Sequence, residues 1–163
     1  MKKFLKLHSR LIISLLLIFQ MIFIFIMSSF GSDSSSAQSG QIIQALRQVF
    51  PNLNNTSHLD ASTLVFIVRK TAHFTEYAIL GILFFLFFRQ FFPQKNGSRY
   101  FIPAILFSFF YACMDEIHQL FIPGRSGQFT DVLINTLGAL FGCLLLVLFR
   151  RSKKAWRARH RSQ

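Results

Sequence analysis

Two histidines lie close to carboxylates inside stretches that are otherwise apolar. Glu76 follows His73 by three residues. Asp115 and Glu116 come just before His118. A carboxylate that orients a histidine ring lets the histidine act as a general base or a nucleophile, so these five residues are the candidate catalytic groups. His73 with Glu76, and Asp115 with His118, are each three residues apart, which is the spacing of metal ligands in some helical bundles. A divalent metal is therefore an alternative to the metal-free site that we expect.

Cationic and polar side chains near the histidines could hold an anionic ligand. Arg69 and Lys70 precede His73, and Arg125 lies in a turn-forming stretch whose glycines leave the backbone open. Guanidinium and ammonium groups bind phosphate oxygens, so a phosphate or pyrophosphate headgroup is the favoured ligand. The candidate binding residues are Arg69, Lys70, Tyr77, Gln119, Arg125, Asp131 and Asn135.

Internal charge pairing is the structural alternative. A buried ion pair can be near neutral in stability, so its presence alone would prove no function. The number of costly groups in so small a protein argues against a purely structural role. A proton or ion path is disfavoured because no ionisable residue continues it into the inner half. The pairs that this alternative predicts are Lys70 or Arg69 with Glu76 or Asp115, and Arg125 with Asp131.

Apolar runs must position these residues. The chain has 163 residues, of which 52% are hydrophobic and 22 are Phe, a composition typical of membrane proteins. Four runs are long enough to cross a bilayer as helices, at residues 11–28, 63–88, 100–121 and 130–149. We therefore expect an all-α, polytopic bundle of four transmembrane helices that forms a single domain and ends in a basic tail.

The segment between the first two runs has two parts. Residues 32–39 are rich in Ser and predict a linker. Residues 41–50 carry apolar side chains at helical spacing and predict a short amphipathic helix that lies on the membrane surface or over the bundle. The first run is long for a signal peptide and no Ala-x-Ala site follows it, so an uncleaved helix is favoured. Cys113 and Cys143 have no metal or redox spacing and are expected to be core residues.

The basic residues indicate a membrane topology. The net charge is +12, and 14 of the 18 Lys and Arg residues lie in the N-terminal segment, residues 89–99 and the C-terminal tail at 150–163. Basic clusters at the edges of apolar runs attract lipid headgroups and argue against nucleic-acid binding. By the positive-inside rule, this multi-pass protein of the cell membrane has both termini in the cytoplasm.

Five polar residues of the second run share one face when they are placed on a helix. They are Arg69, Lys70, His73, Glu76 and Tyr77, within about 120° of one another. The topology also puts the acidic residues of the third and fourth runs near the outer side. We therefore expect an outward-opening polar cavity that is lined by the second, third and fourth helices and rimmed by Arg125.

The fourth run has a narrow polar and small-residue face. Asp131, Asn135, Gly138 and Gly142 recur at helical spacing. Glycines on one helix face allow another helix to approach closely, so this face predicts internal helix packing.

The polar motifs occur in an order that resembles the VanZ-like family of bacterial integral membrane proteins, over roughly residues 10–150. The family is named for a member that lowers susceptibility to teicoplanin-type glycopeptide antibiotics. The resemblance implies a small polytopic envelope protein, with an antibiotic-resistance role as an expectation. The motifs are Arg69-Lys70-x-x-His73-x-x-Glu76-Tyr77, Asp115-Glu116-x-His118-Gln119, Pro123-Gly124-Arg125-Ser126-Gly127 and Asp131-Val132-x-x-Asn135-x-x-Gly138.

These observations lead to one functional hypothesis and two alternatives. The hypothesis is a protein that binds or modifies a phosphorylated or anionic lipid headgroup or wall precursor, with the bilayer as its surroundings. One alternative is a non-enzymatic protein that shields an envelope target from lipoglycopeptides. The other is a charge-paired structural bundle.

Overall fold

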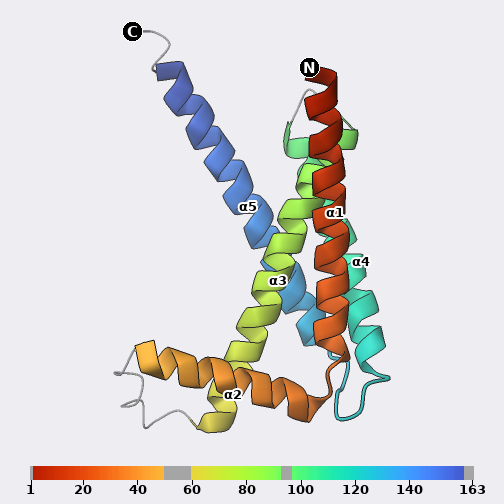
Figure 1. Ribbon diagram of the computed structural model, residues 1–163, viewed down its shortest axis with the longest axis vertical. Helices are drawn as coiled ribbons and strands as arrows, with labels where there is room; N and C mark the ends of the chain where they lie inside the picture. Colours follow the sequence, from red (N-terminus) through yellow and green to blue (C-terminus); the bar gives the residue numbers. More distant parts are fainter. Residues whose placement is uncertain (1, 50–59, 93–96, 160–163) are drawn as a thin grey trace.

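The computed structural model describes residues 2–49, 60–92 and 97–159 (Figure 1). Within these residues the chain is almost entirely helical and has no strand. The elements are α1 (Lys2–Ser29), α2 (Ser32–Val49), α3 (Ala61–Phe91), the 3₁₀-helix η2 (Gly97–Tyr100), α4 (Phe101–Gln119) and α5 (Phe129–Arg159). The predicted all-α fold is therefore confirmed.

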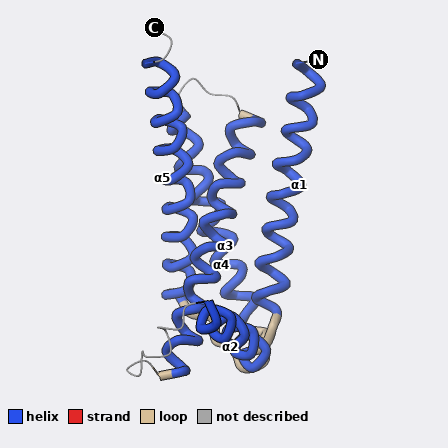
Figure 2. Tube along the Cα trace, turned by 60° about the vertical axis from the view of Figure 1, so that its left-hand side comes forward, coloured by secondary structure: helices blue, strands red, loops and turns tan. Residues whose placement is uncertain are grey.

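Four of the helices are long and apolar enough to cross a membrane. Helices α1, α3, α4 and α5 form the bundle, and α2 lies across one end of it (Figures 1 and 2). The start of α1 and the end of α5 lie at the opposite end. The four predicted spans are confirmed, whereas the membrane side of each end stays a prediction. The spans are Leu7–Ser29, Ala61–Phe91, Phe101–Gln119 and Phe129–Lys153.

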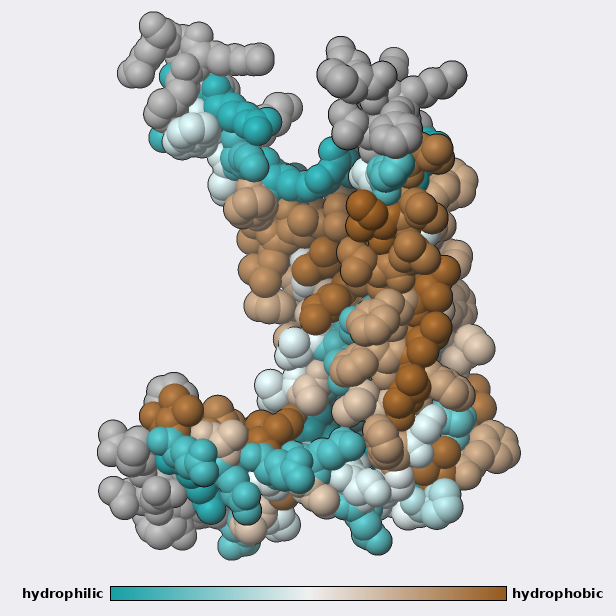
Figure 3. Space-filling model, viewed as in Figure 1, coloured by the Kyte–Doolittle hydropathy of each residue, from teal (hydrophilic) through white to brown (hydrophobic). Residues whose placement is uncertain are grey.

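Apolar side chains cover the outside of the bundle, and hydrophilic residues gather at its two ends (Figure 3). Phe19, Phe110 and Leu137 are all more than half exposed although they lie in spans. A large exposed apolar surface of this kind marks contact with a membrane rather than with water. The outer surface therefore fits the hydrocarbon layer, and the polar residues of the site must face inward.

Glycines bring α3 and α5 into backbone contact. A methyl group added at Gly138 would meet the backbone of Phe74, and one added at Gly142 would meet the backbone of Ala78. From the other side, a Cβ at Gly81 would lie 2.6 Å from a carbonyl oxygen of α5. Because only hydrogen fits at these three points, the axial position of α5 against α3 is fixed. The glycine face that the sequence indicated is thus an internal packing face.

Helix α2 begins earlier than the sequence predicted. The stretch 32–39, which predicted a linker, forms the first half of α2, so that prediction was wrong. Asp33 lies in the first turn, where an acidic side chain stabilises the helix dipole. Ser35 and Ser39 are buried, and the Ser39 hydroxyl donates to the carbonyl of Ser35 at 3.0 Å. Tertiary burial of small side chains therefore outweighs the weak helix propensity of Ser.

Helix α5 continues beyond the predicted span. The tail that was expected from residue 150 is helical as far as Arg159. A run of basic residues with good helix propensity continues the helix without a break, because no Gly or Pro interrupts it. The polar loop at 51–59 and the predicted connection at 93–96 lie outside the described residues.

Candidate functional site

The ionisable face of α3 points into the protein. Tyr77 is fully buried, and the side chains of His73 and Glu76 are only 12% and 13% exposed. Thr71 and Thr75, on the other side of the helix, are exposed. This is the arrangement that the helical spacing predicts.

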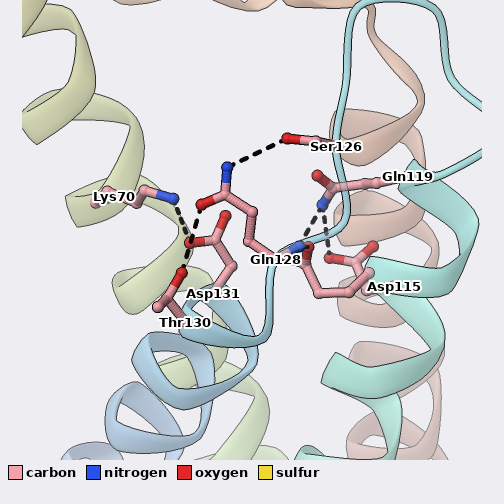
Figure 4. A network of polar contacts seen from close by, with 8 residues as sticks. Lys70, Asp115, Gln119, Ser126, Gln128, Thr130 and Asp131 are labelled. Carbon is pink, nitrogen blue, oxygen red and sulfur yellow. Dashed lines mark hydrogen bonds and ion pairs between the residues drawn. The ribbon is translucent and has the colours of Figure 1, made fainter.

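Lys70 of α3 forms an ion pair with Asp131 in the first turn of α5 (Figure 4). Both side chains are mostly buried, with 13% and 15% exposed. The glycine contact sets the register of the two helices and so places these charges opposite each other. The expected pairing of Lys70 with Glu76 or Asp115 is therefore wrong, and so is the expected pairing of Asp131 with Arg125.

Buried carboxylates of α4 hold the start of α5. Asp115, Glu116 and Gln119 are all buried. The Gln119 side-chain amide lies 3.5 Å from an oxygen of Asp115 and 3.4 Å from an oxygen of Glu116 (Figure 4). The other Glu116 oxygen accepts the backbone N–H of Gln128 at 3.0 Å, just before α5 begins. Glu116 therefore positions the helix turn that carries Asp131.

Several buried polar atoms near these carboxylates have no hydrogen-bond partner in the described part of the chain. They include the hydroxyls of Ser28 and Tyr77 and the side-chain oxygen of Asn135. The Ser28 and Tyr77 hydroxyls lie beside Asp115. Buried polar groups are normally hydrogen-bonded, and the Asp115 carboxylate is the acceptor that lies beside both hydroxyls.

Arg125 stands in the loop between α4 and α5. Its Nε donates to the carbonyl of Phe30, at the junction of α1 and α2, at 3.1 Å. Gly124 just before it has φ 72°, a left-handed conformation that favours glycine. Burial, followed by repulsion from Arg69, lowers the pKa of Arg125 below its usual range. The guanidinium groups of Arg69 and Arg125 are therefore close enough to repel each other.

A cavity of about 60 Å³ lies between α2 and α3, with Arg125 at its edge. The end of α1 and the buried side of α2 form one wall, and α3 forms the other. No described residue of α4 or α5 lines it, so it differs from the cavity that the sequence predicted, because α2 folds over α3. Its polar lining consists of Ser35, Gln38, Ser39, Arg69, His73, Glu76 and Arg125.

His73 and Glu76 form the polar wall of this cavity. Nδ1 of His73 lies 3.4 Å from an oxygen of Glu76, which is within ion-pair distance. Neither atom has a hydrogen bond to the described residues, and both are buried. The dyad faces the same space as Arg69 and Arg125. The cavity therefore brings two guanidinium groups and a histidine–carboxylate pair to one space.

His118 lies elsewhere. Its ring stacks on Phe25 of α1 at 4.4 Å, and its Nε2 lies 3.1 Å from the hydroxyl of Ser29. His118 does not line the cavity between α2 and α3. Among the described residues, no three His, Cys, Asp or Glu side chains are grouped to hold a metal ion. Cys113 and Cys143 are free thiols, as expected for core residues.

The structure adds site residues that the sequence did not single out. Ser35, Gln38 and Ser39 enter the cavity because the predicted linker is a helix. Gln20 of α1 donates from its side chain to the carbonyl of Glu76 at 3.1 Å. Its position in the middle of a long apolar run was the signal that could have revealed it.

Comparison with known proteins agrees with this architecture. Residues 13–150 match the VanZ/LLP1 family, and this range contains all four described spans except the ends of the first and last. The chain matches no curated protein and no solved structure. On the strength of the family match, which covers most of its length, the chain belongs to the VanZ/LLP1 family.

Proposed function

We propose that this VanZ-like membrane protein binds the phosphate of an anionic lipid or lipid-linked wall precursor in the cavity between α2 and α3. The observation that carries the proposal is the juxtaposition of Arg69 and Arg125 at one cavity. Among the described residues neither guanidinium has an acidic partner within ion-pair distance. An anion between them would relieve their repulsion and accept several of their hydrogen bonds.

The roles of the cationic residues differ under this proposal. Lys70 is neutralised by Asp131 and supports the helix contact. Arg69 and Arg125 hold the ligand, and the small polar side chains of Ser35 and Ser39 complete the wall. The positive-inside rule puts the cavity on the outer side, because the basic ends of the chain lie at the other end of the bundle.

Hydrolysis of the bound headgroup, in which water attacks the phosphorus and the lipid alcohol leaves, is a second candidate function. His73 and Glu76 support it, because both are buried, lie 3.4 Å apart and face the space between the two arginines. His73 would act as the base, and Glu76 would orient its ring. In that case His73→Ala removes turnover of the lipid while bound lipid persists.

Native mass spectrometry of the purified protein tests the binding proposal. The wild-type protein is expected to carry a co-purified anionic lipid, and Arg69→Gln and Arg125→Gln are expected to lose it. Arg47→Gln is the matched control, because Arg47 is an exposed arginine in the last turn of α2 and lines neither this cavity nor the apolar space beside it. Equal lipid occupancy in the wild type and in the Arg69→Gln, Arg125→Gln double variant would disprove the proposal.

Membership in the family links the protein to glycopeptide antibiotics as an expectation. A site for a wall precursor would explain such a link, because occupying or modifying the precursor changes the target of a glycopeptide antibiotic. The alternative is a protein that shields the target without catalysis. Teicoplanin susceptibility of cells expressing the variants separates them: shielding tolerates His73→Ala and fails with Arg125→Gln, whereas catalysis fails with both.

A further inference from the structure

An apolar groove of about 560 Å³ adjoins the polar cavity. We propose that it holds the hydrocarbon chain of the lipid whose phosphate lies between Arg69 and Arg125, and that the chain enters sideways from the bilayer. The inference rests on the proposed headgroup site and extends it to the tail. The groove volume falls within the range of about 300–1,000 Å³ found for ligand sites.

The groove lies where hydrocarbon is the natural occupant. Its walls come from the membrane-spanning parts of α1 and α3 and from the apolar side of α2. Ile42 and Leu46 of α2 face it, although they are 47% and 41% exposed in the protein alone. Figure 3 shows the hollow between α2 and the bundle, with hydrophobic side chains along the inner edge of α2. An apolar groove at this depth borders lipid rather than water, so a chain fills it without a desolvation cost.

Groove and cavity adjoin each other along α2 and α3. Ile42, Val68, Ala72 and Glu76 line both of them. Along α3 the lining runs from the level of Arg69 to that of Ile79, a distance of about 15 Å at the helical rise. A lipid can therefore place its phosphate at the arginines and extend its chain along α3 beneath α2. Charge at one end and apolar lining along the rest match a lipid phosphate better than a free phosphate.

Blocking the groove without touching the cavity tests the inference. Thr71 and Thr75 line only the groove and are exposed, so Thr71→Trp and Thr75→Trp fill it without entering the core. Leu137→Trp is the control, because Leu137 is a lipid-facing residue of α5, 54% exposed, outside both sites. The probes are phosphatidic acid in phosphatidylcholine nanodiscs and butyl phosphate, which has the headgroup charge but only a short tail.

Thr71→Trp and Thr75→Trp are expected to weaken phosphatidic acid binding about tenfold, the loss that corresponds to roughly ten atom-to-atom packing contacts between the chain and the groove walls. Butyl phosphate binding is expected to stay unchanged, and Leu137→Trp should bind both probes like the wild type. Arg69→Gln should weaken both. Tryptophan variants that bind phosphatidic acid normally, or that lose both probes alike, would overturn the groove inference. If Arg69→Gln and Arg125→Gln left both probes unaffected, the headgroup site itself would be wrong.

Cross-linking gives a second, independent measurement on the unmodified chain. Phosphatidic acid with a photoreactive diazirine near the end of its acyl chain is expected to label the peptides that contain Phe23 of α1 and Ile79 of α3, which line the groove at the end away from Arg69. Excess unlabelled phosphatidic acid should compete with this labelling. Labelling spread evenly over the lipid-facing sides of α4 and α5, without competition, would contradict the proposed tail site.

Discussion

The ion pair between Lys70 and Asp131 should contribute strongly to the stability of the bundle. Removing one partner of a buried pair costs about 3–5 kcal/mol, whereas an exposed pair contributes about 0–1 kcal/mol. With side chains only 13% and 15% exposed, this pair is close to the buried limit. We therefore expect Asp131→Ala to lower the free energy of unfolding by about 3 kcal/mol, because it leaves an unpaired ammonium group in the protein.

Replacing both charges should recover most of this loss. An apolar pair of similar volume can be as stable as a buried ion pair, so Lys70→Met with Asp131→Leu should unfold much like the wild type. A double-mutant cycle with Lys70→Met and Asp131→Leu as the single variants should give a coupling energy of at least about 3 kcal/mol, because the double variant escapes the loss that one unpaired charge causes. The measurement is unfolding in mixed detergent micelles, titrated with sodium dodecyl sulfate and followed by circular dichroism.

The same variants test the division of roles among the cations. Since Lys70 is satisfied by Asp131, the folded double variant should retain its anionic lipid in native mass spectrometry. Two results would refute the reasoning. Single variants that each cost less than about 0.5 kcal/mol, with additive effects, would show that the pair does not couple. Loss of lipid from a stable double variant would show that Lys70 takes part in ligand binding.

Three further predictions concern packing, the histidines and topology. Gly138→Ala should destabilise the protein by about 1–3 kcal/mol in the same unfolding assay, because its methyl group would meet the α3 backbone; Gly40→Ala, with no atom near the added methyl, should be neutral or stabilising. His118→Ala should reduce stability through the lost ring stacking yet keep lipid binding and turnover, whereas His73→Ala should abolish turnover with little effect on stability. A single cysteine at Ser126, in a chain without its two native cysteines, should react with an impermeant maleimide added outside intact cells, and labelling only after lysis would reverse the topology.

The transmembrane architecture could be predicted because it depends on length and polarity alone. A span requires about 20 apolar residues, and each of the four runs meets that condition whatever its neighbours do. The inward face of α3 was also predictable, since the cost of exposing Lys70, His73 and Glu76 to lipid leaves only one orientation. The glycine face of α5 followed from the same helical periodicity.

The pairing of the polar residues could not be predicted from the sequence. Lys70 had several acidic residues within reach, and the choice of Asp131 depends on the axial register of α3 against α5. That register is set by backbone contacts at three glycines, which the one-dimensional pattern does not give. The cavity between α2 and α3 could not be predicted for a related reason, because the helical state of residues 32–39 depends on burial of Ser35 and Ser39 against other elements.

The contact between Arg125 and Phe30 connects two parts of the chain that are far apart in sequence. Nε of Arg125 donates to the Phe30 carbonyl, and among the described residues the two terminal nitrogens of the same guanidinium have no acceptor, so they could donate to an anion. An anion bound there would contact the same side chain that holds the junction of α1 and α2. A lysine at position 125 would supply the positive charge. Its compact ammonium group could not donate to the Phe30 carbonyl and to an anion in the planar geometry of a guanidinium.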